Sequence, residues 1–254
     1  GNHDDDNVDG NQAKVNLVSV SPSNEATGTE DFYSFDYGLG HFIVLSTQTF
    51  NAQQLEWLRA DLAATDRPWK FAFFHEPYYT YGNHEPSEKA AVWVPILEQY
   101  GVDLVITGHN HNYEQFYAQR GGQVVPFGEG TVHVTAGGAG AALDPIYAFR
   151  SKGDNLQNWR VEYGFVSVVI DVAPDRLSTT MSLIYHKTQA GNGSWPSMAE
   201  DVRYSRPLAA GFCSLLANDG DEAELEPELE PEMELEIEPE PEPEPEAEPD
   251  VADV

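Results

Sequence analysis

Three short segments bring histidine together with glycine, asparagine and acidic residues. They are GNHD at residues 1–4, FFHEP at residues 73–77 and GHNH at residues 108–111. Imidazole nitrogen and amide oxygen suit zinc, iron or manganese, whereas calcium and magnesium favour carboxylates and carbonyls. Two histidines two residues apart can face two adjacent metals, and Gly108 would let the backbone turn closely enough to place them. The three segments therefore predict a transition-metal site.

Two buried strands are expected to deliver the histidines of the second and third segments. Residues 70–74 form an apolar run that ends at His75, and residues 103–107 form another that ends just before His109. A helical pattern precedes each run, and such helix and strand cycles are typical of layered α/β folds. Ligands in these folds collect beyond the carboxyl ends of the strands. The histidines are thus expected at one edge of a sheet.

The elements around these strands are predicted from capping residues and periodicity. Asn51 can cap a helix to about Ala64 that carries leucines 55, 58 and 62 on one face. Ser87 can cap a second helix that runs through Tyr100 and closes at Gly101. Residues 31–45 alternate aromatic and polar side chains around a glycine turn, which predicts a hairpin.

The second half of the chain is richer in strand patterns. Residues 131–135, 164–172 and 177–185 are predicted strands, and together with the first half they indicate an α/β fold, a layered β-sandwich flanked by helices. Composition changes near Asn218, so residues 1–218 are expected to form the globular domain. Residues 219–254 hold 18 acidic residues and seven prolines without Lys or Arg, which predicts a disordered tail.

The three histidine segments resemble the last three signature blocks of the calcineurin-like metallophosphoesterases. GNHD, HEP after an apolar strand, and GHNH running on into Tyr113 and Glu114 carry the resemblance. The extended form GHNHNYEQ is similar to the purple acid phosphatase branch, although Gln115 stands where that branch usually has arginine. The resemblance covers about residues 1–190, and the stretch at 130–138 fits it as well.

The resemblance implies a role for each matching residue. One metal would be bound by Asn2, His75 and His109, and His111 would belong to the other metal. His3 would contact the phosphoryl group of the substrate, and Asp4 would orient His3. His84 follows His75 by nine residues, where purple acid phosphatases place a histidine that binds substrate and protonates the leaving group.

The implied activity is hydrolysis of a phosphomonoester at a binuclear centre, with metal-bound hydroxide as the nucleophile. The metals would be iron together with zinc, manganese or a second iron. The family's first two blocks would precede Gly1, so we expect a chain that begins partway through its catalytic domain and alone holds at most one metal, weakly. Two alternatives stay open: a phosphodiesterase or nucleotidase of the same superfamily, and a non-catalytic module tethered to a surface.

Charge and hydropathy limit the partners. The net charge is −30, and removing the 18 acidic residues of the tail leaves −12 on the domain. An acidic domain argues against nucleic acid as the main partner, whereas a small phosphate ester remains compatible with a local metal site. No apolar run reaches 18 residues, so no membrane span is predicted. The tail fits a spacer in a secreted or cell-envelope protein, or a charged tail that promotes solubility.

Several other residues have simpler interpretations. The single cysteine, Cys213, is expected to act as a small apolar residue, and the histidines at 41, 133 and 186 are expected to be structural. The glycine-rich residues 137–140 lack the Lys and Ser or Thr of a phosphate-binding loop, which favours a flexible loop at the rim of the site. The tyrosines at 78, 79 and 81 could line a substrate pocket or simply pack together.

Overall fold

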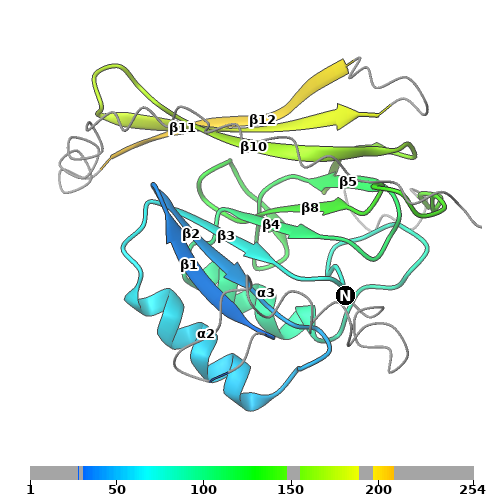
Figure 1. Ribbon diagram of the computed structural model, residues 1–254, viewed down its shortest axis with the longest axis horizontal. Helices are drawn as coiled ribbons and strands as arrows, with labels where there is room; N and C mark the ends of the chain where they lie inside the picture. The colour runs from blue at the N-terminus through cyan, green and yellow to red at the C-terminus, as the bar shows by residue number, and fades with distance from the viewer. Residues whose placement is uncertain (1–27, 29–30, 148–154, 189–196, 209–254) are drawn as a thin grey trace, which may run out of the picture. The chain divides into compact units, whose positions relative to one another are not determined.

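The computed structural model describes residue 28 and residues 31–147, 155–188 and 197–208. The predictions for Asn2, His3, Asp4, Cys213 and the acidic tail fall outside these ranges. The described part of the domain has three layers: two helices, a large mixed sheet and a smaller antiparallel sheet (Figure 1). The predicted α/β class with a layered β-sandwich and flanking helices is confirmed.

The large sheet has seven strands in the order β1-β2-β3-β4-β8-β5-β9. Their bounds are β1 Tyr33–Tyr37, β2 Gly40–Val44, β3 Trp69–Phe73, β4 Leu104–Thr107, β8 Val132–Ala136, β5 Tyr113–Phe116 and β9 Leu156–Arg160. Strands β2, β3, β4 and β8 are parallel, and the remaining pairings are antiparallel. The predicted hairpin is β1 and β2, turning at Gly38 with φ +53°. The sequence did not predict β5 and β9.

Two helices, α2 (Ala52–Ala64) and α3 (Ala90–Gln99), cover one face of the large sheet (Figure 1). As predicted, the Asn51 side chain caps α2 by accepting a hydrogen bond from the Gln54 amide at 2.9 Å. Gly101 closes α3 with φ +66°, and its amide bonds the Glu98 carbonyl while the next amide bonds the Leu97 carbonyl. Apolar residues from both helices and from the sheet form one core.

The helix α3 starts later than predicted. It begins at Ala90, and Lys89 directly before it makes no capping hydrogen bond with its side chain. The Ser87 hydroxyl nevertheless accepts a hydrogen bond from the Ala90 amide at 3.4 Å, and the Ser87 carbonyl accepts one from the Ala91 amide at 3.0 Å. The same hydroxyl donates its proton to Glu76 at 2.8 Å, so Ser87 also ties the start of the helix to the loop after His75.

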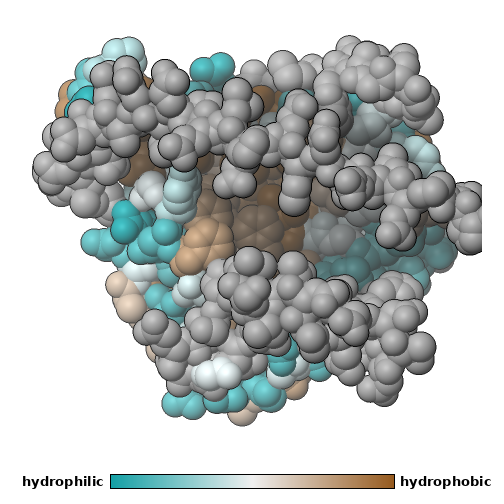
Figure 2. All heavy atoms as spheres, viewed as in Figure 1, coloured by the Kyte–Doolittle hydropathy of each residue, from teal (hydrophilic) through white to brown (hydrophobic). Residues whose placement is uncertain are grey.

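The opposite face of the large sheet packs against a three-stranded antiparallel sheet. Its strands are β10 Gly164–Val172, β11 Ser178–Lys187 and β12 Ser197–Pro207, in that order. Met181, Leu183 and Tyr185 of β11 are buried against the large sheet, where the Tyr113 and Tyr185 rings lie 4.5 Å apart. Figure 2 shows apolar side chains gathered in the middle of the view, where the layers meet. β10 and β11 match predicted strands, whereas β12 was not predicted.

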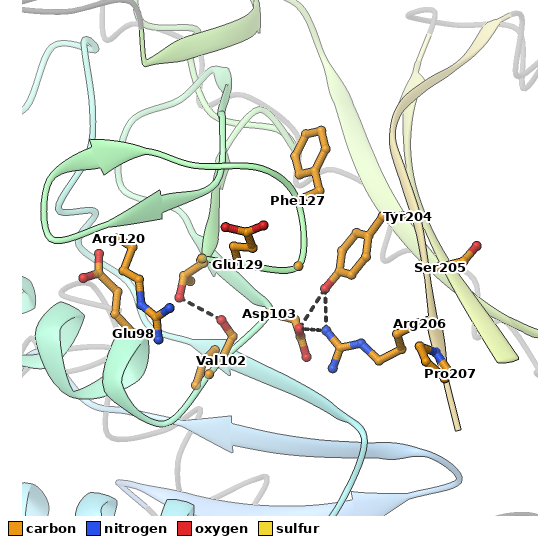
Figure 3. A pocket seen from close by; sticks show the side chains of 14 residues that line it. Glu98, Val102, Asp103, Arg120, Phe127, Glu129, Tyr204, Ser205, Arg206 and Pro207 are labelled. Atoms are coloured by element: carbon orange, nitrogen blue, oxygen red, sulfur yellow. Dashed lines mark hydrogen bonds and ion pairs between the residues drawn. The ribbon is translucent and has the colours of Figure 1, made fainter. Parts of the chain in front are cut away.

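A buried ionic group joins β12 to the start of β4. Asp103 is 4% exposed and accepts hydrogen bonds from the Arg206 guanidinium, from the Tyr204 hydroxyl at 2.7 Å and from the Lys70 amide at 2.9 Å (Figure 3). The Arg206 guanidinium also lies over the Trp69 ring, 4.1 Å from its centroid. Burial raises the pKa of Asp103, although Arg206 opposes that shift. These contacts lie at the edge of the large sheet opposite to the one that carries the histidines.

A second buried charged group ties the hairpin to α2. His41 is 5% exposed, and its two ring nitrogens lie 2.7 Å from Asp36 and 2.9 Å from Asp61. Burial opposes protonation of His41, but the hydrogen bonds that its ring donates to these two carboxylates raise its pKa above the usual value. The imidazole is thus held as a cation between two anions, consistent with the predicted structural role.

The His41 arrangement predicts that stability depends on pH. Because the folded-state pKa is raised, the stabilisation is fully present below the unfolded pKa of about 6.5 and is lost as pH rises through the folded value. His41→Gln should therefore lower the free energy of unfolding more at about pH 6 than at about pH 9. Urea denaturation across this pH range measures the loss of unfolding free energy. His186→Gln is the control, because the His186 ring bonds the Ser167 hydroxyl. Equal loss at both pH values would contradict the assignment.

The Asp103 group predicts a large effect of removing its cation. Arg206→Met leaves a buried carboxylate without its ion-pair partner and should lower the free energy of unfolding by about 3 kcal/mol. Lys89→Met removes the more exposed ion-pair partner of Glu76 and should change the free energy of unfolding by less than about 1 kcal/mol. Urea titrations of both variants at neutral pH compare them. Similar small losses in the two variants would show that Asp103 does not depend on Arg206.

Candidate functional site

The histidine loops meet because strand pairing continues past the ends of β3 and β4. Beyond the strands, the Phe74 amide donates to the Ile106 carbonyl at 3.3 Å, and the Gly108 amide donates to the His75 carbonyl at 3.0 Å. These bonds bring His75 and His109 to the same carboxyl edge of the sheet. The predicted placement of both histidines at strand ends is what the structure shows.

His75, His84 and His109 form a compact cluster at this edge. The His75 Nε2 and His109 Nδ1 atoms lie 3.2 Å apart, and the two rings are nearly perpendicular at 69°. The His84 ring lies over the His109 ring, with 4.0 Å between their centroids. The His109 ring therefore contacts the other two imidazoles, which come from two other positions in the sequence.

The backbone at His109 explains how the third segment turns. His109 has φ +66°, a left-handed conformation that is uncommon for any residue with a side chain. Such a residue stores about 1–3 kcal/mol of strain and is found most often at functional sites. The expected need for glycine at 108 is not supported, because a Cβ there would meet His75 ring atoms only at 3.6 and 3.9 Å. The strained turn is made by His109 instead.

His111 is held by a separate loop. Its Nδ1 lies 2.9 Å from the Ala142 carbonyl, which can only accept, so Nδ1 carries the proton and Nε2 keeps its lone pair. The Asp144 carboxylate accepts a hydrogen bond from the His111 backbone amide at 2.9 Å. The Asp144 backbone amide donates a second hydrogen bond to the His111 carbonyl. A backbone carbonyl that fixes the tautomer in this way is typical of metal-binding histidines.

Burial and a neighbouring imidazole favour the neutral form of His109. Burial lowers the pKa of His109, and the neighbouring His84 lowers it further. Glu76 follows His75 directly; burial opposes its ionisation, but hydrogen bonds from Ser87 and Lys89 hold its pKa below the usual value. A neutral ring beside an ionised carboxylate is the form in which histidine binds a metal.

The donor atoms fit one transition-metal ion better than two. Two imidazole nitrogens 3.2 Å apart, each about 2.0–2.1 Å from a metal, would subtend roughly 100° at it, close to a tetrahedral or octahedral angle. Within residues 31–147, 155–188 and 197–208, no group of three or more His, Cys, Asp or Glu side chains is arranged to hold an ion. The described residues thus supply a pair of ligands and not a complete cage.

The glycine and tyrosine segments near the site have structural roles. A Cβ at Gly137 would lie 2.1 Å from the Asn110 carbonyl oxygen, so this glycine permits two backbones to pack together. Tyr79 packs against Tyr78 and His133, and its hydroxyl pKa is raised by burial. Tyr81 donates its hydroxyl to Asn155 at 2.5 Å. These contacts favour loop packing over the alternative of a substrate-lining role.

Sequence reasoning missed several residues that hold the site in place. Glu76 and Asp144 bind backbone or side chains beside the histidines, and Asn110 and Thr80 bind the loop that carries His84. Asn110 was visible inside GHNH, but nothing in the sequence indicates which loop it contacts. A pocket of about 550 Å³ lies at the opposite edge, lined by Glu98, Asp103 and Arg206 (Figure 3), away from the histidine cluster.

Comparison with known proteins agrees with this geometry. The calcineurin-like phosphoesterase family matches residues 1–113. The chain is 39% identical over 118 residues to purple acid phosphatase 18 of Arabidopsis thaliana, covering 43% of this chain and 26% of that protein. It is 31% identical over 162 residues to acid phosphatase A of Cryphonectria parasitica, covering 52% of this chain and 31% of that protein. The chain is similar to calcineurin-like phosphoesterases of the purple acid phosphatase-like branch.

The solved structures support the fold of this branch. A purple acid phosphatase from yellow lupin (Lupinus luteus) seeds superposes with a TM-score of 0.56 at 21% identity, covering 73% of this chain and 34% of that one. The sequence matches, together with this fold, confirm the predicted resemblance to the purple acid phosphatase-like branch. The chain spans between about a quarter and a third of these relatives' lengths. Among the described helices, none is long and apolar enough to cross a membrane.

The geometry of the histidine pair predicts a low metal stoichiometry. Calorimetric titration of the chain with Zn²⁺, at a salt concentration that screens the acidic tail, should show at most about one weakly bound ion per chain. His75→Ala and His109→Ala should each remove this binding, whereas His186→Ala should leave it unchanged because that ring lies on β11. Two tightly bound ions, or unchanged binding in His109→Ala, would contradict the assignment.

Proposed function

We propose that the chain is part of a metal-dependent phosphoesterase that hydrolyses small phosphomonoesters. The observation that carries this proposal is the His75 and His109 pair, 3.2 Å apart at the carboxyl edge of the sheet, with His84 stacked beside it. The matches to acid phosphatases support a phosphoesterase function in general. A substrate phosphate would lie beside this cluster.

In the proposed mechanism, His75, His109 and Asn2 would hold one metal and His111 would belong to a second, the pair being iron with zinc, manganese or a second iron. Such a pair would supply Lewis acidity that activates water and neutralises the phosphoryl oxygens. The chain's own residues would orient the substrate: His3 would contact the phosphoryl group, and Asp4 would orient His3. His84 donates a proton to the departing oxygen of the alcohol.

The position of His84 suits an acid more than a ligand. Its ring overlaps the face of His109, so a protonated His84 can point a ring N–H away from the metal pair and toward a leaving group. Metal binding and proton donation are thus assigned to different rings of one cluster.

One observation favours a second candidate, a module without catalysis. The described residues bring together only two metal ligands in contact, and a binuclear centre needs more, with at least one bridging carboxylate. If no further ligands join them, the domain acts as a scaffold. A secreted or cell-envelope location, with the acidic tail as spacer, stays a prediction under either candidate.

Turnover with synthetic esters tests the proposal. A version of the protein that also carries the family's first two blocks, supplied with Fe²⁺ and Zn²⁺, should hydrolyse p-nitrophenyl phosphate, and faster than bis(p-nitrophenyl) phosphate if monoesters are the substrates. His75→Ala and His109→Ala should each lower kcat/KM by at least about 100-fold, because the metal is lost with its ligand. Near-normal turnover in either variant would overturn the site assignment. A chain that binds zinc without any turnover would favour the scaffold.

A further inference from the structure

The amide of Asn110 lies at the centre of a buried polar network beside the histidine cluster. Asn110 is 0% exposed, and its Oδ1 accepts a hydrogen bond from the His84 amide at 2.7 Å. Its Nδ2 donates to the Thr80 hydroxyl at 2.8 Å and, at 3.4 Å, to the His84 carbonyl. One side chain therefore bonds both ends of the loop at residues 80–84.

This network is anchored in the large sheet. The Thr80 hydroxyl, which accepts from Asn110, donates its own proton to Glu114 at 2.9 Å. The other carboxylate oxygen of Glu114 accepts from the Tyr81 amide at 2.6 Å, and Glu114 is 0% exposed on strand β5. A continuous set of hydrogen bonds thus runs from β5 through Thr80 and Asn110 to the backbone of His84.

Packing leaves the Asn110 amide no freedom to move. A Cβ at Gly82 would lie 2.5 Å from the Asn110 Cγ atom, closer than real contacts allow, so the loop backbone rests directly on the amide. A Cβ at Gly137 would lie 2.1 Å from the backbone carbonyl oxygen of Asn110, so the backbone of Asn110 is closely packed as well. Because the side-chain amide rests directly on the loop backbone at Gly82, it sets where the loop lies.

We propose that Asn110 is a positioning residue that holds His84 against His109, with Thr80 and Glu114 as its anchor in the sheet. Asn110 itself touches no substrate in this arrangement; it acts through the backbone of His84. The consequence for catalysis rests on the proposed function, because it needs His84 to protonate a leaving group. The predicted position of the His84 ring does not depend on the proposed function.

The position of the ring is tested first, in the full metal-free chain. In the wild type, NMR should show a cross-peak between the ring protons of His84 and His109, and a slowly exchanging His84 amide. Asn110→Ala should remove the cross-peak and raise the exchange rate of that amide by about 10-fold or more, since the amide loses its acceptor. The matched control is Thr131→Val, which loses a buried hydrogen bond of 2.7 Å at the opposite edge of the sheet.

A second variant reaches the same loop by a different route. Gly82→Ala keeps Asn110 but forces the loop away from it, and should cause the same loss of cross-peak and amide protection. This variant decides the question if Asn110→Ala does not fold. An intact cross-peak and protected amide in a folded variant of either kind would overturn the proposal. So would equal changes in Thr131→Val, which would indicate general loosening.

The catalytic consequence is tested by the choice of leaving group. Proton donation matters more for phenyl phosphate than for p-nitrophenyl phosphate, because phenolate is the poorer leaving group. Asn110→Ala should therefore lower kcat for phenyl phosphate by about 10-fold more than for p-nitrophenyl phosphate, with KM changing little. Equal losses on both esters would overturn the link to proton donation. Absence of turnover in the version that also carries the family's first two blocks would refute the proposed function, while the NMR result would still decide the positioning role.

Discussion

The site depends on parallel pairing between β3 and β4 that does not stop where the strands end. The backbone hydrogen bonds from Phe74 to Ile106 and from Gly108 to His75 keep the two segments paired in register just beyond the ends of the strands. That step places two imidazole nitrogens 3.2 Å apart. Without it, the two histidines would leave the sheet on independent loops, and nothing in their own side chains would bring them together.

The layers on either side make this edge rigid enough to hold strain. One core joins α2 and α3 to the sheet, and another joins the sheet to β10–β12, with Asp103 and Arg206 as an ionic link at the far edge. The left-handed backbone of His109 costs about 1–3 kcal/mol, which such packing can offset. The lowered pKa of His109, the hydrogen bond from His111 Nδ1 to the Ala142 carbonyl and the buried Asn110 network then determine which atoms face the metal and substrate region.

Local sequence patterns predicted the elements that position the site, but not the contacts between loops. The apolar runs before His75 and His109, the Asn51 cap and the Gly101 helix end depend on nearby residues and appear in the structure. The Ser87 hydroxyl donates to Glu76, eleven residues away, a contact that the neighbouring residues do not indicate. The strand at β5 was missed because YEQF has polar residues at positions that are buried here, such as Glu114 and Gln115. Their burial depends on partners such as Thr80 and Gln157, which lie 34 and 42 residues away.

The central claim is that His75 and His109 are two ligands of one metal. Anomalous diffraction from crystals of the chain grown with Zn²⁺ tests it most directly, because it locates the ion independently of activity. The account predicts a peak about 2.0–2.1 Å from both His75 Nε2 and His109 Nδ1. Zinc bound only elsewhere on the chain, with the two rings still hydrogen-bonded to each other, would contradict it.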